Sequence, residues 1–481
     1  MFKKWEVYGM NQEKRRKRAL ITFGIGEGAY QFMYDFFKDF QNFFLTNIAN
    51  MNPVMTGTII SAMNIFKVFF SPVTGVIIDS NPFKSKDKFL PWIRYMPFVL
   101  TAFFMAMAGS AWAKLPTPVT IVFFVSAYIF NTLLFNGYKG AIPTLAKNEN
   151  EVSVVSTSSN LFKEVCRFLV GVAGPLLIVK LSATGKAEDA QGFFFTLLIF
   201  CSITIILYLT VAFEYKNATV GELKETVKEI KRQGKRGKAN VSAMLRQIVS
   251  NKPLLIVFLT CSFAIVRYFV AAPMAPYFFK YVIGDVTLMA WYKAATQIVA
   301  IAATFLAPFI LKYVIKDIKK LYIIILIAIT GAHLGLAVTG SSLWGFNILM
   351  TIAQFFYSLK GVYDIVLFAA AIDYAVWKNI KKGGKETVAQ GTAMSFYFMA
   401  ITISQVIGVS ILNWGLVQAG YQGAETVANP ALAANLMNVV TYLPAAACVI
   451  ALIIFLFFKL DQNKLSEMRK EIAEYKELQK E

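Results

Sequence analysis

Residues 56–97 read TGTIISAMNIFKVFFSPVTGVIIDSNPFKSKDKFLPWIRYMP. A mostly apolar run ends near Asp79, a short loop with several lysines follows, and a second apolar run begins near Pro91. A helix needs about 20 apolar residues to cross a hydrocarbon layer about 30 Å thick. The segment therefore predicts two membrane-spanning helices joined by a basic turn.

The same alternation continues along the rest of the chain. Of its 481 residues, 57% are hydrophobic and 16% are charged, against about 25% charged residues in soluble domains. This composition excludes soluble enzymes, disulfide-rich secreted domains and disordered chains. We predict an all-α polytopic membrane protein with twelve transmembrane helices, at residues 20–48, 53–79, 91–113, 118–145, 153–180, 191–213, 253–282, 286–311, 321–340, 343–376, 388–415 and 435–458.

A long charged segment divides these helices into six and six. It alternates basic and apolar residues, which is typical of a helix lying on a membrane surface. Two six-helix bundles are the layout of many secondary transporters, which bind their substrate near the middle of the bilayer. The expected domains are a basic tail at 1–19, a bundle at 20–213, a linker with an interfacial helix at 214–252, a bundle at 253–458 and a C-terminal tail at 459–481.

The basic residues are distributed unevenly between the loops. The two tails and alternate loops hold 36 of the 48 Lys and Arg residues, whereas the loops between them hold only Lys114, Lys180, Lys186 and Lys280. Because basic residues near span ends stay in the cytoplasm, we expect a cell-membrane protein with both termini cytoplasmic. The net charge of +20 is then explained by the orientation of the chain in the membrane, because the excess basic residues lie in the loops expected to face the cytoplasm. We therefore expect no nucleic-acid partner. The four cysteines lie singly in spans, so we expect neither a disulfide nor a metal site.

Polar residues follow one face of several predicted spans. In the first span Gln31, Asp35, Lys38 and Asp39 recur every three or four residues, which aligns them on a helix. Such groups are costly in hydrocarbon and normally face water or a partner. We expect them to line an aqueous path together with residues of other spans: Asn64, Lys67, Asn131, Lys139, Asn160, Lys163, Glu164, Arg167, Arg267, Lys293, Gln297, Lys360 and Asp364.

Basic residues outnumber acidic ones within the spans. We count eight cations and four carboxylates, the latter being Asp35, Asp39, Glu164 and Asp364. Helical spacing pairs Asp35 with Lys38, and Lys360 with Asp364, which leaves about four cations unpaired. A buried cation without a partner is costly unless water or an anion supplies one. We interpret the surplus as favouring an anionic solute; the alternative is that these side chains reach the interface or brace the bundles.

Four stretches of the sequence resemble one known family. They are the segment 56–97, with Pro72, Gly75, Asp79 and Pro91-Trp92; the sequence Pro143-Thr144-Leu145; FFKYVIGDVTLMAWY at 278–292; and AAIDYAVWKN at 370–379. In this order they resemble the glycoside–pentoside–hexuronide:cation symporters, the melibiose-permease branch of the major facilitator superfamily. The resemblance implies the major facilitator fold, alternating access, and a sugar transported together with sodium or a proton. We expect a monomer in the lipid bilayer.

The chain departs from the family where sodium and galactosides bind. The two carboxylates that bind sodium in the second helix of relatives fall on Lys67 and Ser71. Acidic residues that hold galactosides fall on Gln31 and Phe135, and an eleventh-helix lysine falls on Gln390. The comparison implies that the usual sodium site is lost, and that the Lys67 ammonium takes roughly the place of the cation.

We therefore predict transport of an anionic sugar, such as a hexuronide or a sulfonated or phosphorylated sugar, or of another organic anion. Coupling would use a proton rather than sodium, carried by Asp35, Asp39, Glu164 or Asp364, and no cofactor is expected. The alternatives are a lysolipid transporter of the same superfamily, a neutral glycoside:cation symporter and a channel. An enzyme is not expected, because we find no metal cluster, nucleophile–base set or nucleotide loop. The predicted substrate-binding residues are Gln31, Asn64, Lys67, Asn131, Lys139, Arg267, Lys293 and Gln390.

Further residues suggest gating and packing roles. Asp79, Lys86, Lys88 and Arg94 resemble the gate loop of the superfamily, and Asp373 would act similarly in the second half; the alternative is that these charges only set topology. The glycines at positions 24, 26 and 28 favour close helix packing. The single histidine, His333, is expected to be a packed residue rather than a proton relay.

Overall fold

The computed structural model describes residues 14–146, 149–219, 251–381, 391–423, 426–460 and 462–478. These residues form helices, turns and loops, and the described ranges contain no strand. Their contacts divide them into two units. The first unit holds the described residues within Met1–Gly237, Asp285–Ala294 and Gln422–Thr426, and the second holds those within Lys238–Gly284, Ala295–Tyr421 and Val427–Glu481.

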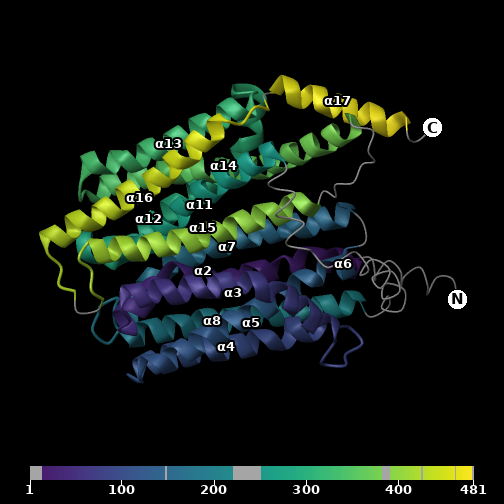
Figure 1. Ribbon diagram of the computed structural model, residues 1–481. Helices are drawn as coiled ribbons and strands as arrows, with labels where there is room; N and C mark the ends of the chain where they lie inside the picture. Colours follow the sequence, from purple (N-terminus) through teal and green to yellow (C-terminus); the bar gives the residue numbers. More distant parts are fainter. Residues whose placement is uncertain are drawn as a thin grey trace. The chain divides into compact units, whose positions relative to one another are not determined.

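The first unit is built on α2, which packs against α7 and α8, while α4 packs against α5 and α8, and α3 against α5 (Figure 1). A π-helical turn at Phe44–Ile48 extends α2, and the short 3-10 helix Val286–Leu288 also belongs to this unit. The helix bounds are α2 Ile25–Phe43, α3 Pro53–Asp79, α4 Leu90–Trp112, α5 Thr117–Gly140, α6 Ile142–Leu145, α7 Glu149–Lys180 and α8 Ala190–Thr219.

The second unit is built on α11, which packs against α14, α15 and α16, while α13 packs against α14 and α16. π-helical turns at Phe278–Ile283 and Ile310–Val314 follow α11 and α12, and the division between the units falls within α12, after Ala294. The helix bounds are α11 Lys252–Tyr277, α12 Met289–Phe309, α13 Ile318–Thr339, α14 Leu343–Lys381, α15 Gly391–Gln418, α16 Pro430–Leu456 and α17 Gln462–Leu478.

The predicted all-α polytopic membrane class is confirmed. Within the described residues, nine helices are long and apolar enough to cross a membrane. The long helices α2, α3 and α7 are not among the nine, and they carry many of the charged and amide residues expected to line a path. Hydropathy therefore does not by itself establish the predicted number of twelve spans. Most of the predicted linker, residues 220–250, lies outside the described residues, so the domain boundaries stay predictions.

Side-chain caps fix where several helices begin. The Asn52 side chain accepts a hydrogen bond from the Val54 backbone N–H at 2.8 Å, with Pro53 in the first turn. Asn429 caps α16 in the same way, with Pro430 following it. Asparagine satisfies a free N–H at a helix start, and proline fits there because it has no N–H to satisfy. The cap explains why α16 starts five residues before the predicted position 435.

The three glycines near the start of α2 allow neighbouring helices to approach closely. A Cβ atom at Gly26 would lie 2.4 Å from the Tyr138 ring of α5, and one at Gly28 would lie 2.7 Å from Cys166 Sγ of α7. Neither distance is possible between nonbonded atoms, so any side chain at these positions would push the helices apart. The predicted packing role of the glycine string is confirmed.

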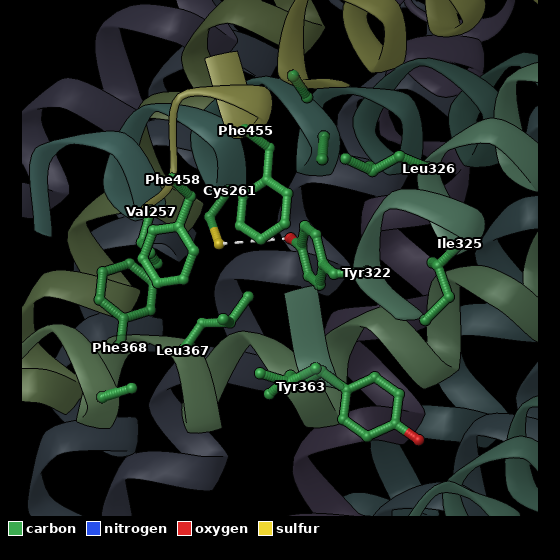
Figure 2. Close-up of a cluster of buried hydrophobic side chains, with 14 of the residues drawn as sticks. Val257, Cys261, Tyr322, Ile325, Leu326, Tyr363, Leu367, Phe368, Phe455 and Phe458 are labelled. Atoms are coloured by element: carbon green, nitrogen blue, oxygen red, sulfur yellow. Dashed lines mark hydrogen bonds between the residues drawn. The ribbon is translucent and has the colours of Figure 1, made fainter. Parts of the chain in front are cut away.

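The C-terminal helix α17, which lies within the predicted C-terminal tail at 459–481, docks on α14. Met468 of α17 is fully buried and belongs to the apolar core of the second unit, part of which Figure 2 shows. The Trp377 indole N–H of α14 donates to Glu471 at 2.6 Å, and Lys381 lies 3.2 Å from the same carboxylate. These two contacts hold the pKa of Glu471 below its ordinary value of 4.5.

We predict that Met468→Glu releases α17 from α14, because a carboxylate cannot stay charged in an apolar core. Limited trypsin digestion of the purified protein should cut within residues 462–478 faster than in the parent, and the control Glu474→Gln should not change the rate, since the Glu474 side chain is 59% exposed and the change removes no trypsin site. Because docking lowers the pKa of Glu471, its charged carboxylate stabilises the docked helix fully above pH 4.5. This stabilisation declines as the pH falls below that value and the carboxylate takes up a proton. Equal digestion of Met468→Glu and the parent would contradict the docking.

Candidate substrate site

Asp35 of α2 lies at the centre of a buried charge cluster in the first unit. Its carboxylate accepts from Lys38 Nζ at 2.7 Å and from Arg167 Nε of α7 at 2.6 Å. The Gln31 amide donates to the same carboxylate at 2.6 Å when its NH₂ group is turned toward it, the orientation that the hydrogen bonding requires. Arg167 also lies 3.4 Å from Glu164. Lys163 lies 3.4 Å from Glu164 as well, so three cations share these two carboxylates, and the predicted pair Asp35–Lys38 is confirmed.

Lys67 of α3 differs from its neighbours in having no carboxylate. Among the residues that the structure describes, no acidic oxygen lies within 4.0 Å of its ammonium. Its nitrogen lies 5.6 Å from the centre of the Tyr34 ring, a distance typical of a cation–π contact. Lys38 Nζ lies 5.7 Å from the same ring. Lys67 is half-buried, so its charge is partly removed from water with only an aromatic face beside it.

Two buried asparagines lie on the helices around these residues. Asn131 of α5 donates from Nδ2 to the Tyr30 hydroxyl at 3.0 Å, but its Oδ1 atom has no partner in the described part of the chain. Asn64, one turn before Lys67, is 1% exposed, and neither its Nδ2 nor its Oδ1 has a partner there. Buried amides without partners are uncommon, because each lost hydrogen bond costs about 1–3 kcal/mol. A ligand hydroxyl is one kind of group that satisfies them.

The structure corrects the count of unpaired cations. Lys139, predicted to bind substrate, forms an ion pair with Glu27 of α2, a carboxylate that the count of four acidic residues omitted. Lys293 pairs with Asp39 at 2.6 Å. The inference of about four unpaired cations was therefore wrong, and the charge argument for Lys139 and Lys293 as anion contacts no longer holds. Glu27 was detectable from the sequence, because it lies one helical turn before Gln31 on the same stripe.

Arg267 of α11, another predicted substrate contact, is 2% exposed within the second unit. Its Nε donates to His333 Nε2 at 3.0 Å, and its Nη1 donates to Gln354 Oε1 at 3.0 Å. Since His333 Nε2 accepts from Arg267, the Nδ1 atom carries the proton and donates to the Val440 carbonyl at 3.0 Å. The geometry is that of a packed histidine, as expected, and Arg267 is held by neutral partners inside the unit.

Asp364 of α14 is fully buried and accepts three hydrogen bonds. Lys360 Nζ lies 2.6 Å away, which confirms that predicted pair; the Tyr322 hydroxyl lies 2.7 Å away and the Cys261 thiol 3.3 Å away. Figure 2 shows Cys261 and Tyr322 facing each other among the core side chains. This pair joins α11, α13 and α14 within the apolar core.

Charge pairs also occur at the predicted gating positions. Asp79, at the end of α3, lies 2.5 Å from Lys88, and Asp373 of α14 lies 3.6 Å from Arg469 of α17. Lys86 and Arg94 are exposed. A cavity of about 360 Å³ lies beside Asp79 and is also lined by Gly75, Asn136 and Gly140. Gln390 lies outside the described residues, and the gating roles stay predictions.

The family model described as "MFS/sugar transport protein" matches residues 22–462. The chain belongs to this family. Its members and the relatives below are transporters that act on small molecules, so the protein is a secondary transporter of a sugar-type solute rather than an enzyme. The predicted resemblance to the glycoside–pentoside–hexuronide symporters is confirmed.

Three curated relatives match almost the whole chain. An uncharacterized symporter, YjmB, of Bacillus subtilis (strain 168) is 24% identical, over 95% of this chain and 96% of its own. An isoprimeverose transporter of Lactiplantibacillus pentosus is 22% identical, over 92% and 88%. A putative 2,3-dihydroxypropane-1-sulfonate exporter of Escherichia coli (strain K12) is 21% identical, over 94% and 94%.

Solved structures show the same fold at low sequence identity. A crystal structure of a D-xylose-proton symporter superimposes with a TM-score of 0.57 at 14% identity, covering 93% of this chain and 97% of that chain. The likeness establishes the major facilitator fold.

We predict that Asp364→Asn lowers the free energy of unfolding by about 3–5 kcal/mol, because it leaves the Lys360 ammonium buried without a counter-charge. Thermal or denaturant unfolding in detergent measures the change. The double variant Lys360→Met/Asp364→Leu should recover most of the loss, since similar apolar side chains remove both charges. Tyr322→Phe, which removes one hydrogen bond, should cost about 1 kcal/mol. A double variant as unstable as Asp364→Asn would show that the pair is needed for more than mutual neutralisation.

Proposed function

We propose that this transporter carries an anionic sugar-type solute, and that the ammonium of Lys67 binds its acidic group. The observation that carries the proposal is the half-buried Lys67 without a carboxylate within 4.0 Å among the described residues. The other lysines counted within the spans of the first unit, together with Lys293, lie within that distance of an acidic side chain; they are Lys38, Lys139 and Lys163. Among these lysines of the described first unit, Lys67 is the one whose charge is free to pair with an anion.

The surroundings of Lys67 fit a hydroxylated anion. An ammonium pairs well with a carboxylate, sulfonate or phosphate, and such charge-assisted bonds are about twice as strong as neutral ones. Asn64 and Asn131 offer amide groups with unused hydrogen-bonding capacity, which suit sugar hydroxyls. The relative named as a putative 2,3-dihydroxypropane-1-sulfonate exporter supports this substrate class, since the compound in its name bears hydroxyls and a sulfonate.

The proposal includes a change of coupling. By the resemblance described above, Lys67 falls at a position where sodium-using members of the family carry a carboxylate, and an ammonium cannot ligate sodium, which needs oxygen ligands. Sodium coupling through that position is therefore not expected, and a proton is the favoured coupling ion. Both termini would face the cytoplasm, on the basis of the basic loops.

The four candidate proton carriers differ in how firmly each is held. Asp35 is bonded to Lys38 and Arg167, so its protonation would leave two cations without their partner. Asp364 accepts three hydrogen bonds in the core. By contrast, Asp39 pairs with Lys293 through Oδ2, while its buried Oδ1 has no partner in the described residues. Glu164 lies 3.4 Å from both Lys163 and Arg167, longer than the 2.6–2.7 Å contacts of Asp35. We favour Asp39 and Glu164 as the carriers.

A neutral sugar is the second candidate. The relative named as an isoprimeverose transporter favours it, since that name denotes a neutral disaccharide. In this case the Lys67 ammonium would replace the coupling cation and make no contact with an acidic group of the solute.

We predict that Lys67→Gln weakens binding of an anionic sugar by about 10- to 100-fold, because one hydrogen-bonded charge pair is lost, and leaves binding of a matched neutral sugar nearly unchanged. Glucuronate against glucose, and 6-deoxy-6-sulfoglucose against glucose, are suitable pairs. Inhibition of uptake in proteoliposomes, or calorimetry on the purified protein, gives the affinities.

The matched control is the double variant Glu27→Gln/Lys139→Gln, which removes a lysine that already has its own carboxylate. It should keep the preference for the anion. If the parent protein binds only the neutral member of each pair, or if Lys67→Gln lowers the affinity for both members equally, the anion proposal is wrong.

A further inference from the structure

The ring of Tyr34, on α2, lies near two lysines, Lys38 of the same helix and Lys67 of α3. Its ring centre lies 5.6 Å from Lys67 Nζ and 5.7 Å from Lys38 Nζ. The ring also stacks on Tyr30, one turn earlier, with 4.9 Å between centres and 23° between planes. Tyr30 is fixed in turn by the hydrogen bond from Asn131. Tyr34 is therefore held in place from its own helix and, through Tyr30, from α5.

The two lysines use this ring differently. Lys38 is 8% exposed and bonded to Asp35, so its position is set by the carboxylate. For the Lys67 ammonium, the Tyr34 ring lies 5.6 Å away, and no acidic oxygen of the described residues lies within 4.0 Å. A lysine side chain has four rotatable bonds and moves freely unless something holds its end. The electron-rich face of Tyr34 is what keeps this ammonium beside α2.

An aromatic face is a partner that a substrate anion need not displace. A carboxylate in the same place would neutralise Lys67, as Glu27 neutralises Lys139, and would compete with an anionic solute. The ring attracts the cation through its quadrupole, yet leaves the hydrogens of the ammonium able to bond to oxygen. A neutral sugar gains nothing comparable from the charge of Lys67.

We infer that Tyr34 is a positioning residue that sets the preference for anionic over neutral substrates, by holding the Lys67 ammonium over its ring with its N–H groups available to the acidic group of the solute. The inference rests on the proposed function and adds a residue and a mechanism to it. The ring, and not the hydroxyl, is the part that acts on Lys67. No catalytic or proton-transfer step is involved.

The test is a double-mutant cycle between Tyr34 and Lys67. The affinities of 6-deoxy-6-sulfoglucose and of glucose are measured by calorimetry on the purified full-length protein, for the parent, Tyr34→Phe, Tyr34→Leu, Lys67→Gln and Tyr34→Leu/Lys67→Gln. Thermal unfolding of each variant checks its fold, and Tyr34→Phe keeps the ring should Tyr34→Leu fold poorly.

Tyr34→Leu should lower the affinity for the sulfonated sugar by about tenfold and that for glucose by less than about threefold. Tyr34→Phe should retain the selectivity of the parent, since phenylalanine preserves the aromatic face. In the Lys67→Gln background, Tyr34→Leu should have little further effect on the sulfonated sugar, because there is no ammonium left to position.

The outcomes separate the two proposals. If the parent does not prefer the sulfonated sugar, the proposed function fails and this inference fails with it. Suppose that the parent does prefer the sulfonated sugar. If Tyr34→Leu then keeps this preference, or if its effect adds in full to that of Lys67→Gln, the inference about Tyr34 is overturned while the proposed function stands. Loss of selectivity in Tyr34→Phe would also overturn it, since the hydroxyl would then be the active group.

Discussion

A charged side chain inside a membrane-spanning helix needs a partner, because lipid offers it neither water nor hydrogen bonds. The described part of this chain meets that constraint mainly with ion pairs inside each unit. Asp35 holds Lys38 and Arg167 together in the first unit, and Asp364 holds Lys360 in the core of the second. These pairs join α2 to α7 in the first unit and lie on a buried face of α14 in the second.

Lys67 differs from these paired residues, because no carboxylate of the described residues lies within 4.0 Å of its ammonium. A helix that places a lysine beside an aromatic ring, one turn after a buried asparagine without partners, retains capacity for both charge and hydrogen bonding. In a family of sugar transporters, those are the two kinds of contact that a hydroxylated anion needs. Paired lysines such as Lys139 and Lys293 instead stabilise the arrangement of helices. The distinction between a structural and a substrate-binding cation thus depends on whether a carboxylate is already in contact.

Much of the fold was predictable because its determinants are local. Span length follows from the thickness of the bilayer, and α3 was expected at 53–79, where the structure has it. The pairs Asp35–Lys38 and Lys360–Asp364 were predictable because three or four residues separate them on one helix. Other contacts depend on how helices pack. The bond between Arg167 and Asp35 joins residues 132 positions apart, and no spacing rule shows that Lys139 meets Glu27 or that Arg267 meets His333. For the same reason, Tyr34 was not among the predicted site residues, although Tyr30, Tyr34 and Lys38 follow each other at helical spacing.

The most direct measurement is the position of the acidic group in an experimental structure of the protein with a bound sulfonated or carboxylated sugar. The account predicts an acidic oxygen within about 4 Å of Lys67 Nζ, with the ammonium still beside the Tyr34 ring. A bound sugar whose acidic group lies elsewhere, with Lys67 pointing to the membrane interface or paired with a carboxylate of the protein, would contradict it.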